Sequence, residues 1–262
     1  MSAGAAAPCA SAQVIARAVD YPYRWPGRSY LFHGGRAHPV VERDRWREGR
    51  VPVLAYGSNR APEQLVRKFG VLPHDRAVLV ERCKVPGFDV VHSAHVTSYG
   101  AIPAALAEDP AVTVTVAVTW LDREQVAIMD ASERAGRNYG RQRLARTVTL
   151  DDGSASNAVE AYLTRHGSLA VDGRVASHGD IEALGRGSPA IRHREVLALA
   201  HRHLAPEDGF ETFVLRWRGI RRGAISRPAG SSRACRRAPP RPLRSNARPA
   251  APLSRDGYPE PD

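Results

Sequence analysis

Leu54-Ala55-Tyr56-Gly57-Ser58-Asn59 is the stretch from which the fold of this 262-residue chain can be worked out. It closes the short apolar run Val51–Tyr56, which is typical of a buried strand. A helix is expected soon after it, over Pro62–Phe69, because proline suits a first helical turn and apolar residues recur there at helical spacing.

The four residues Tyr56, Gly57, Ser58 and Asn59 have the composition of a strand-to-helix turn. Glycine lets the backbone turn without a Cβ, and Ser and Asn favour tight turns and helix caps. Free N–H groups at the start of a helix can hold a carboxylate or a phosphate. An ordinary connecting turn would have the same composition, so turn chemistry alone leaves both interpretations open.

A second group of residues follows the most regular strand pattern of the chain. In Ala111–Leu121 valines alternate with threonines and alanine, which predicts a strand. The next segment, Asp122–Asp130, predicts a short helix with Asp122 as N-cap and Gln125 in a capping box. Glu133 comes just after this helix, and taken alone it would be a solvated residue at a helix end.

The remaining patterns outline a domain with flanking segments. Strands are expected over Arg76–Val85 and Phe88–Val96, joined by a turn at Pro86-Gly87, over Gln142–Leu150 and over Val159–Thr164, and a helix over Ile191–Leu204. The chain then divides into a disordered leader (1–20), an extended aromatic arm (21–50), a domain (51–165), a loop and C-terminal helix packed on it (166–217) and a disordered Arg/Pro-rich tail (218–262).

Taken together, the two groups of residues resemble the gamma-glutamylcyclotransferase family. The Tyr56-Gly57-Ser58-Asn59 loop, the Asp130-x-x-Glu133 pattern after a valine-rich strand, and Tyr139 and Arg141 before another strand carry the resemblance, in this order and spacing. It implies an α+β fold, a small mixed β-barrel flanked by short helices. It also implies that Glu133 is the catalytic acid and base, and that Tyr56, Gly57, Ser58, Asn59 and Tyr139 bind the substrate.

The resemblance implies an enzyme that cyclises a gamma-glutamyl amide to 5-oxoproline and releases an amine or amino acid, with a small gamma-glutamyl molecule as partner. Such a reaction needs no metal and no cofactor. Two positions depart from the family pattern: Arg134 stands where glycine usually follows the catalytic Glu, and Arg60 where leucine often follows the loop. The alternative is a non-catalytic protein on the same fold that binds a ligand, or nucleic acid through its basic tail.

The net charge of +11 is concentrated in the last part of the chain. Residues 216–262 contain 12 Arg and three acidic residues, so the rest of the chain is nearly neutral. Frequent prolines and few aliphatic residues predict that this tail does not fold, and any binding of nucleic acid through it should be nonspecific and sensitive to salt. An abrupt change of composition near Arg218 also suggests a shift of reading frame.

Other sites receive little support from the sequence. The three cysteines, Cys9, Cys83 and Cys235, are odd in number and far apart, which argues against a disulfide framework or a zinc cage. His92 and His95 are three residues apart, so a strand would point them to opposite faces, and His193, His201 and His203 are expected to decorate a helix. No apolar run approaches the roughly 20 residues that span a bilayer. A cytoplasmic location is therefore expected, whereas no feature of the sequence sets an oligomeric state.

Overall fold

Residues 10–133, 138–217 and 235–238 are described by the structure, a computed structural model. Its helices are α1 Ala10–Val19, α2 Arg43–Arg47, α3 Pro62–Phe69, α4 Arg123–Glu133, α5 His193–Leu204 and α6 Phe210–Arg216, with 3-10 turns at Ser58–Arg60 and His74–Arg76. None of the helices formed by the described residues is long and apolar enough to cross a lipid bilayer.

The strands of the described residues form one large and one small sheet. They are β1 Tyr30–His33, β2 Arg36–His38, β3 Val51–Ala55, β4 Val78–His92, β5 Ala104–Leu121, β6 Tyr139–Arg143, β7 Val148–Leu150, β8 Ala155–Ser156, β9 Glu160–Thr164, β10 Ser168–Val171, β11 Arg174–Val175, β12 Ser177–His178, β13 Ala183–Leu184, β14 Ala190–Ile191 and β15 Cys235–Ala238.

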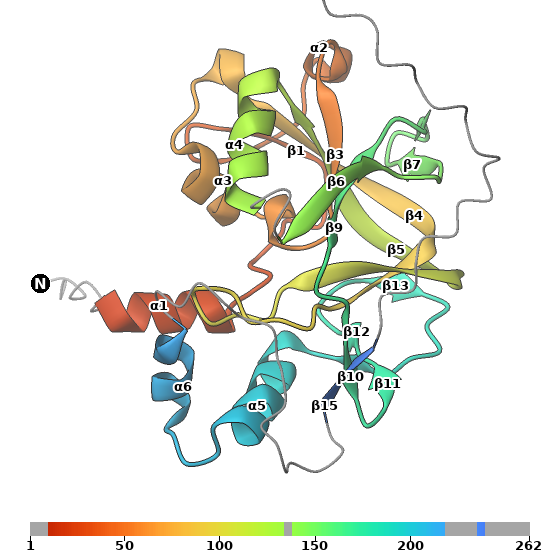
Figure 1. The fold of residues 1–262 in the computed structure, drawn as a ribbon. Coiled ribbons are helices and arrows are strands. Elements are labelled where there is room, and N and C mark those ends of the chain that lie inside the picture. Colours follow the sequence, from red (N-terminus) through yellow and green to blue (C-terminus); the bar gives the residue numbers. More distant parts are fainter. Residues whose placement is uncertain (1–9, 134–137, 218–234, 239–262) are drawn as a thin grey trace, which may run out of the picture.

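The large sheet is mixed, with the order β14-β12-β4-β5-β3-β9-β6 (Figure 1). Strand β3 runs parallel to β9, and β12 runs parallel to β14, whereas β4, β5 and β3 are joined in antiparallel pairs. The predicted α+β class is confirmed. The predicted barrel is not found: among the described residues the path ends at β6 on one side and at β14 on the other, and these strands do not pair.

The hairpin of β4 and β5 is the spine of the large sheet. Strand β4 pairs with β5 along most of its length, and β1, β7 and β12 share its other edge. The alternation predicted for β5 is confirmed by the burial of Val112, Val114, Val116 and Val118. Thr115 and Thr119 are buried as well, because both faces of this part of the strand are covered.

The predicted turn at Pro86-Gly87 is wrong. Residues 78–92 form one continuous strand whose register against β5 shifts between Pro86 and Phe88. Gly87 has a φ of 80°, a left-handed conformation that glycine adopts at little cost. A bulge of this kind accommodates proline, which has no N–H to donate to the ladder, without ending the strand.

Helices α3 and α4 lie together on one side of the large sheet (Figure 1). Their buried residues Leu65, Val126 and Met129 share a core cluster with residues of β1, β3, β4 and β5. The helix predicted at Pro62–Phe69 is confirmed. The capping box of α4 is also confirmed, since Asp122 Oδ1 accepts from the Gln125 N–H at 2.8 Å and Gln125 Oε1 accepts from the Asp122 N–H at 3.0 Å.

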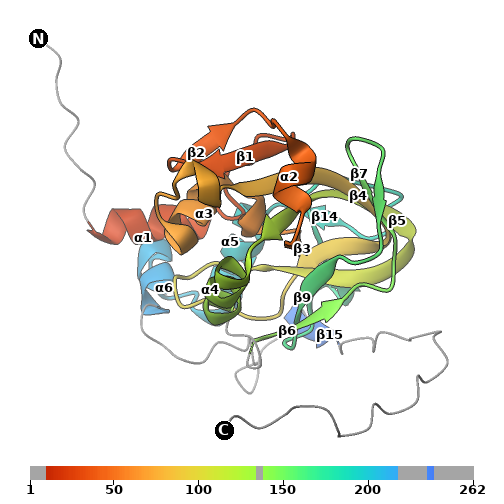
Figure 2. The same ribbon diagram turned by 90° about the horizontal axis from the view of Figure 1, so that it is seen from above.

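Residues 10–20 of the predicted leader, and the aromatic arm, belong to the folded body. Residues 10–19 form α1 instead of a disordered leader, because Ile15, Ala18 and Val19 give one face of the segment an apolar surface that packs with α5 and α6. Both views place α1 beside α6 (Figures 1 and 2). The arm is not merely extended: it supplies β1, β2 and α2, and Tyr30 and Phe32 are buried in the core.

The C-terminal part contains more regular structure than expected. The segment predicted as loop, 165–190, includes the short strands β10 to β14, and α6 follows α5. Four residues of the segment predicted to be disordered form β15, which pairs antiparallel with β10. The other predictions for the leader and the tail concern residues 1–9, 218–234 and 239–262, which lie outside the described part of the chain.

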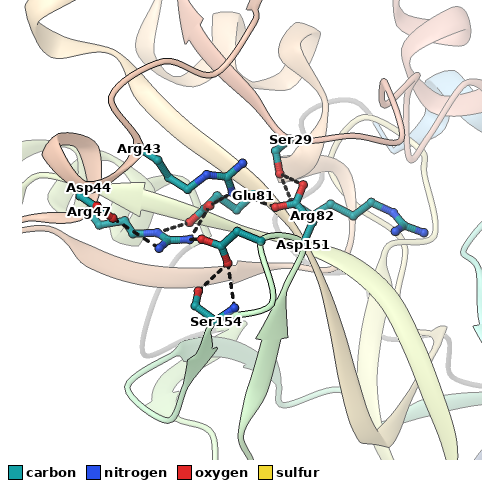
Figure 3. Close-up of polar contacts among 9 residues, drawn as sticks. Ser29, Arg43, Asp44, Arg47, Glu81, Arg82, Asp151 and Ser154 are labelled. Carbon is teal, nitrogen blue, oxygen red and sulfur yellow. Dashed lines mark hydrogen bonds and ion pairs between the residues drawn. The ribbon is translucent and has the colours of Figure 1, made fainter.

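A buried carboxylate fastens α2 to the large sheet. Glu81 of β4 is fully buried and accepts two hydrogen bonds of 2.7 Å from Arg47 and one from Arg43 (Figure 3). The same arginines bind the turn between β7 and β8, where Arg43 contacts Asp151 at 2.8 Å and Arg47 contacts Asp152 at 2.7 Å. This network therefore joins the arm, the central hairpin and the β7–β8 turn.

We expect Glu81→Gln to lower the free energy of unfolding by about 2–4 kcal/mol. Removing one member of a fully buried ion pair typically costs roughly 3–5 kcal/mol. Both arginines keep some contact with solvent and with their other acidic partners, so the loss should lie at or below that range. Urea denaturation of the variant and the wild-type chain measures the difference.

Asp44→Asn is the matched control, because Asp44 pairs with the same Arg47 at 3.7 Å but its side chain is 97% exposed. Exposed ion pairs contribute little, so its denaturation midpoint should match that of the wild-type chain. Equal midpoints for all three chains would show that the Glu81 network does not stabilise the fold.

Candidate active site

One pocket of about 640 Å³ brings together all six residues that the sequence singled out as site residues. They come from the end of β3, from the last residue of α4 and from the first residue of β6, and they are Tyr56, Gly57, Ser58, Asn59, Glu133 and Tyr139. The pocket also receives side chains from α1, from α3 and from the connection between β4 and β5.

The loop after β3 is held from both sides. The hydroxyl of buried Tyr56 donates to the carbonyl oxygen of Tyr162 at 2.5 Å. Gly57 has a φ of −109°, so a left-handed backbone is not what requires glycine here. A Cβ at this position would lie 2.6 Å from the Tyr21 hydroxyl oxygen and 3.3 Å from Ala104 Cβ. Any larger residue at this position would therefore force Tyr21 to move.

Glu133 and the loop meet although they are 74 residues apart in the sequence. Glu133 Oε1 accepts a hydrogen bond from Asn59 Nδ2 at 2.9 Å and an ion-pair contact from Lys68 Nζ at 2.5 Å. Lys68 also donates to Ser132 Oγ at 2.7 Å. The carboxylate is therefore held at the pocket wall by α3 and by the loop, with 19% of its side chain exposed.

Cations dominate the charge of the pocket wall. Arg17, Arg67 and Lys68 line it, whereas Glu133 is the one acidic residue among the described lining residues. The Arg17 guanidinium lies 4.2 Å from the centre of the Tyr99 ring, and that of Arg67 lies 4.4 Å from the Tyr23 ring. Aromatic faces attract guanidinium groups, so these contacts orient two positive charges at the pocket.

Tyr56, Tyr139 and His95, which line the pocket, are neutral near pH 7. Burial raises the pKa of Tyr56 and of Tyr139 well above the ordinary value, so both keep their hydroxyl proton. Burial, with a smaller effect from the neighbouring His166 ring, lowers the pKa of His95 to about 3. The His95 ring is fixed by a hydrogen bond of 2.8 Å between Nδ1 and Ser93 Oγ.

The other residues of the second motif support the pocket from behind. Asp130 accepts a hydrogen bond of 2.6 Å from the Tyr162 hydroxyl and pairs with Arg141 at 2.9 Å. Tyr162 is the residue whose carbonyl oxygen holds Tyr56. In the Asp130-x-x-Glu133 pattern, the Glu133 carboxylate thus lines the pocket, and the Asp130 carboxylate holds Tyr162 and Arg141 beside it.

Several lining residues were not anticipated from the sequence. Arg17 and Tyr21 lie in segments predicted as leader and arm, and Lys68 was given no role. A signal for Lys68 exists, because it is one of only two lysines in the chain. Of the two departures from the family pattern, Arg60 stacks over Trp25 at 4.7 Å and donates to the Asp180 carbonyl at 3.4 Å. Arg134 lies outside the described residues.

The histidines are arranged differently from the prediction. His193 is buried and does not decorate the surface of its helix. His92 and His95 serve different places: His95 lines the pocket, whereas His92 gathers with His178 and His193. Within the described part of the chain, these three form the group whose side chains could hold a metal ion, and none of them lines the pocket.

Comparison with known proteins identifies a family for the central part of the chain. The model of the family "Gamma-glutamyl cyclotransferase, AIG2-like" matches residues 53–182, which include the loop and Glu133. The central domain of the chain belongs to this family. No curated protein matched the sequence.

Several solved structures resemble the chain at low sequence identity. A gamma-glutamyl cyclotransferase is 13% identical over 70% of this chain and 92% of its own, with a TM-score of 0.38. A protein from Arabidopsis thaliana, whose structure was determined in solution, is 19% identical over 45% of this chain and 70% of its own, with a TM-score of 0.35. An AIG2-like protein from Mus musculus is 15% identical over 46% of this chain and 81% of its own, with a TM-score of 0.30.

In this gamma-glutamyl cyclotransferase-like domain we expect Gly57→Ala to destabilise the chain by about 1–3 kcal/mol, the usual cost of overpacking. Gly57→Val should destabilise the chain more than Gly57→Ala, and Ser58→Ala should destabilise it less than either. Because the clash is with the Tyr21 hydroxyl, the loss caused by Gly57→Ala should be smaller in a Tyr21→Phe background. Thermal unfolding of the single and double variants gives this coupling.

Gly140→Ala is the control for this series. A Cβ at Gly140 would meet no atom within 4 Å, and its backbone is not left-handed. It should leave the midpoint of unfolding nearly unchanged. A loss for Gly57→Ala that is no larger than the loss for Gly140→Ala would mean that the loop is an ordinary connector.

Proposed function

We propose that this protein cyclises a gamma-glutamyl amide to 5-oxoproline and releases the amine or amino acid that was joined to it. The observation that carries the proposal is the meeting of the Glu133 carboxylate with the Tyr56–Asn59 loop at the wall of one pocket. A carboxylate beside a loop of this kind supplies the two things that the reaction requires: a group that moves a proton, and a cradle that bends the substrate.

In the proposed reaction the α-amine nitrogen of the substrate attacks its own γ-carbonyl carbon. A new carbon–nitrogen bond closes the five-membered ring, and the amide bond to the leaving amine breaks. No water is consumed and no nucleophile from the protein is required. Holding the reacting atoms in place can contribute roughly 7–11 kcal/mol, so the main task of the pocket is to fold the glutamyl chain back on itself.

Glu133 would take a proton from the attacking amine and give one to the leaving amine. Both hydrogen bonds that it receives within the described residues end on Oε1, which leaves Oε2 to exchange the proton. Asn59 fits a positioning role, because its Nδ2 holds Glu133 while its buried Oδ1 has no hydrogen-bond partner among the described residues. That oxygen can accept a hydrogen bond from the substrate's α-amine.

The positive charges of the pocket favour a substrate with carboxylates. Arg17 and Arg67 line the pocket and could bind the α-carboxylate of the glutamyl group and a second acid on the leaving group, although Arg67 would have to share its charge with Glu63, its ion-pair partner on α3. A leaving amino acid has such a group and a simple alkylamine does not. We therefore expect gamma-glutamyl dipeptides to react faster than gamma-glutamyl alkylamides.

The direct experiment is a screen of gamma-glutamyl dipeptides and gamma-glutamyl amines for release of 5-oxoproline by the full chain. Calorimetric titration of the same compounds separates turnover from binding. A chain that binds them and releases no 5-oxoproline would be a binding protein on this fold. A chain that neither binds nor converts any of them would remove the proposed substrate class.

We expect Glu133→Gln to lower turnover by about 10² or more and to keep the fold, because a positioned acid and base typically contributes about 10²–10⁴-fold. Circular dichroism checks the fold, and the 5-oxoproline assay gives the rate. Glu124→Gln is the matched control, since Glu124 lies on the same helix with its side chain 77% exposed. If Glu133→Gln turned over as fast as Glu124→Gln, Glu133 would have no part in the chemistry.

A further inference from the structure

Three histidines from distant parts of the sequence meet inside the protein. His92 ends β4, His178 ends β12 and His193 begins α5. Each is at most 1% exposed, and one ligand nitrogen of each ring lies within 4.8 Å of those of the other two. The rings of His92 and His178 are stacked with their centres 4.2 Å apart.

Backbone carbonyl groups hold the far side of two of these rings. His92 Nε2 lies 2.8 Å from the carbonyl oxygen of Ile191, and His193 Nε2 lies 2.9 Å from that of Ala18. A carbonyl oxygen only accepts, so in both rings Nε2 must have the proton and Nδ1 has the free lone pair. This is the arrangement in which histidines commonly bind metal ions, with the second nitrogen donating to a carbonyl or carboxylate.

The remaining ring nitrogens of the cluster are buried without hydrogen-bond partners among the described residues. They are His92 Nδ1, His193 Nδ1 and both nitrogens of His178. The Ile102 backbone also favours a proton on the His193 ring, less than the Ala18 carbonyl does. Buried polar atoms normally find a partner, and a native group that has none requires an explanation. A bound cation would accept all three lone pairs at once, whereas a single water molecule has only two protons to donate.

Charged groups around the cluster are compatible with a cation. The Asp180 carboxylate lies 3.8 Å from His178 Nδ1 and accepts the backbone N–H of His193 at 2.7 Å. Arg60 and Arg186 lie near enough to oppose positive charge on His178; Arg186 is paired with Asp89 at 2.9 Å, and Arg60 stacks on Trp25.

We propose that His92, His178 and His193 form a binding site for one divalent transition-metal ion of the zinc type. Imidazole nitrogens suit Zn²⁺ better than Mg²⁺ or Ca²⁺, which prefer oxygen ligands. Asp180 faces Nδ1 of His178, so this ring would bind the ion through Nε2. The Asp180 carboxylate would not bind the ion itself but would orient the His178 ring. Zinc requires these nitrogens at roughly 2.0–2.1 Å from the ion, so the rings would have to turn toward a common point from the separations of up to 4.8 Å seen here.

Such an ion would join segments that the sequence keeps far apart. Strands β4 and β12 and helix α5 provide the ligands, and the Ala18 carbonyl ties in α1. The Tyr21 ring lies 5.1 Å from His193 and 6.0 Å from His178, and its hydroxyl contacts the pocket loop. The site is buried away from the pocket lining, so its role would be to stabilise the fold and the floor of the pocket.

The test uses the full chain after treatment with a chelator. Zinc affinity and stoichiometry are measured by competition with a chromophoric chelator, and the melting temperature is recorded with Zn²⁺, with Mg²⁺ and without added metal. We expect one zinc ion per chain, a higher melting temperature with Zn²⁺ and none of this effect with Mg²⁺. A wild-type chain that takes up no zinc, or that melts at the same temperature with and without it, would overturn the proposal.

His178→Phe is the informative variant, because it keeps a ring stacked on His92 and removes no hydrogen bond among the described residues. We expect zinc affinity to fall by at least about 100-fold, beyond the roughly 10–100-fold typical of changes to the residues that support metal ligands. Its metal-free melting temperature should stay close to that of the wild-type chain. Should Phe prove too large for the site, His178→Met provides the same test.

A surface group of histidines provides the control. The ring centre of His33 lies 3.8 Å from that of His38, on which it stacks, and 4.8 Å from that of His74. Zinc could be captured by these histidines without a preformed buried site. His38→Ala should keep the stoichiometry and the melting shift of the wild-type chain. Zinc uptake that is lost in His38→Ala and kept in His178→Phe would place the ion on the surface and overturn the proposal.

Discussion

The contact between the Tyr21 hydroxyl and the backbone at Gly57 is the constraint on which the pocket depends. The hydroxyl accepts the Ala104 N–H at 2.8 Å and leaves no room for a Cβ at Gly57. One phenol group thereby sets the distance between the N-terminal segment, the loop after β3 and the start of β5. Tyr139 and Glu133 line the same pocket, so its shape depends on a packing contact from Tyr21, a residue outside the two motifs that carry the family resemblance.

Two glutamates illustrate how this fold treats negative charge in different ways. Glu81 is fully buried and is met by two arginines, both of which also bind the β7–β8 turn, so its charge is fully occupied in holding structure together. Glu133 has one lysine and one amide group on a single oxygen and borders a cavity. A carboxylate with unused capacity beside a cavity can exchange protons, whereas a saturated one cannot, and this difference separates a structural acid from a candidate catalytic one.

Local patterns predicted the parts of the fold that local interactions determine. The strand before Tyr56, the helix over Pro62–Phe69 and the capping box at Asp122 each depend on neighbours a few residues away, and the six predicted site residues line one pocket. The failures involve distant partners. Pro86-Gly87 became a bulge because β5 continues the pairing on both sides of it. Arg17 and the histidine cluster could not be anticipated, because only the folded chain brings α1 to the pocket and α5 to the end of β4.

The pairing of β1 with β4 has a consequence for any shortened form of this protein. The family match begins at residue 53, whereas Tyr30, Leu31 and Phe32 pair with Val80, Leu79 and Val78. A fragment cut at the family boundary would present these three apolar residues as a bare sheet edge. Exposed apolar edges recruit strands from other chains. The segment that precedes residue 53 therefore covers this edge of β4 and prevents self-association through it. A recombinant fragment has to include this segment to remain monodisperse.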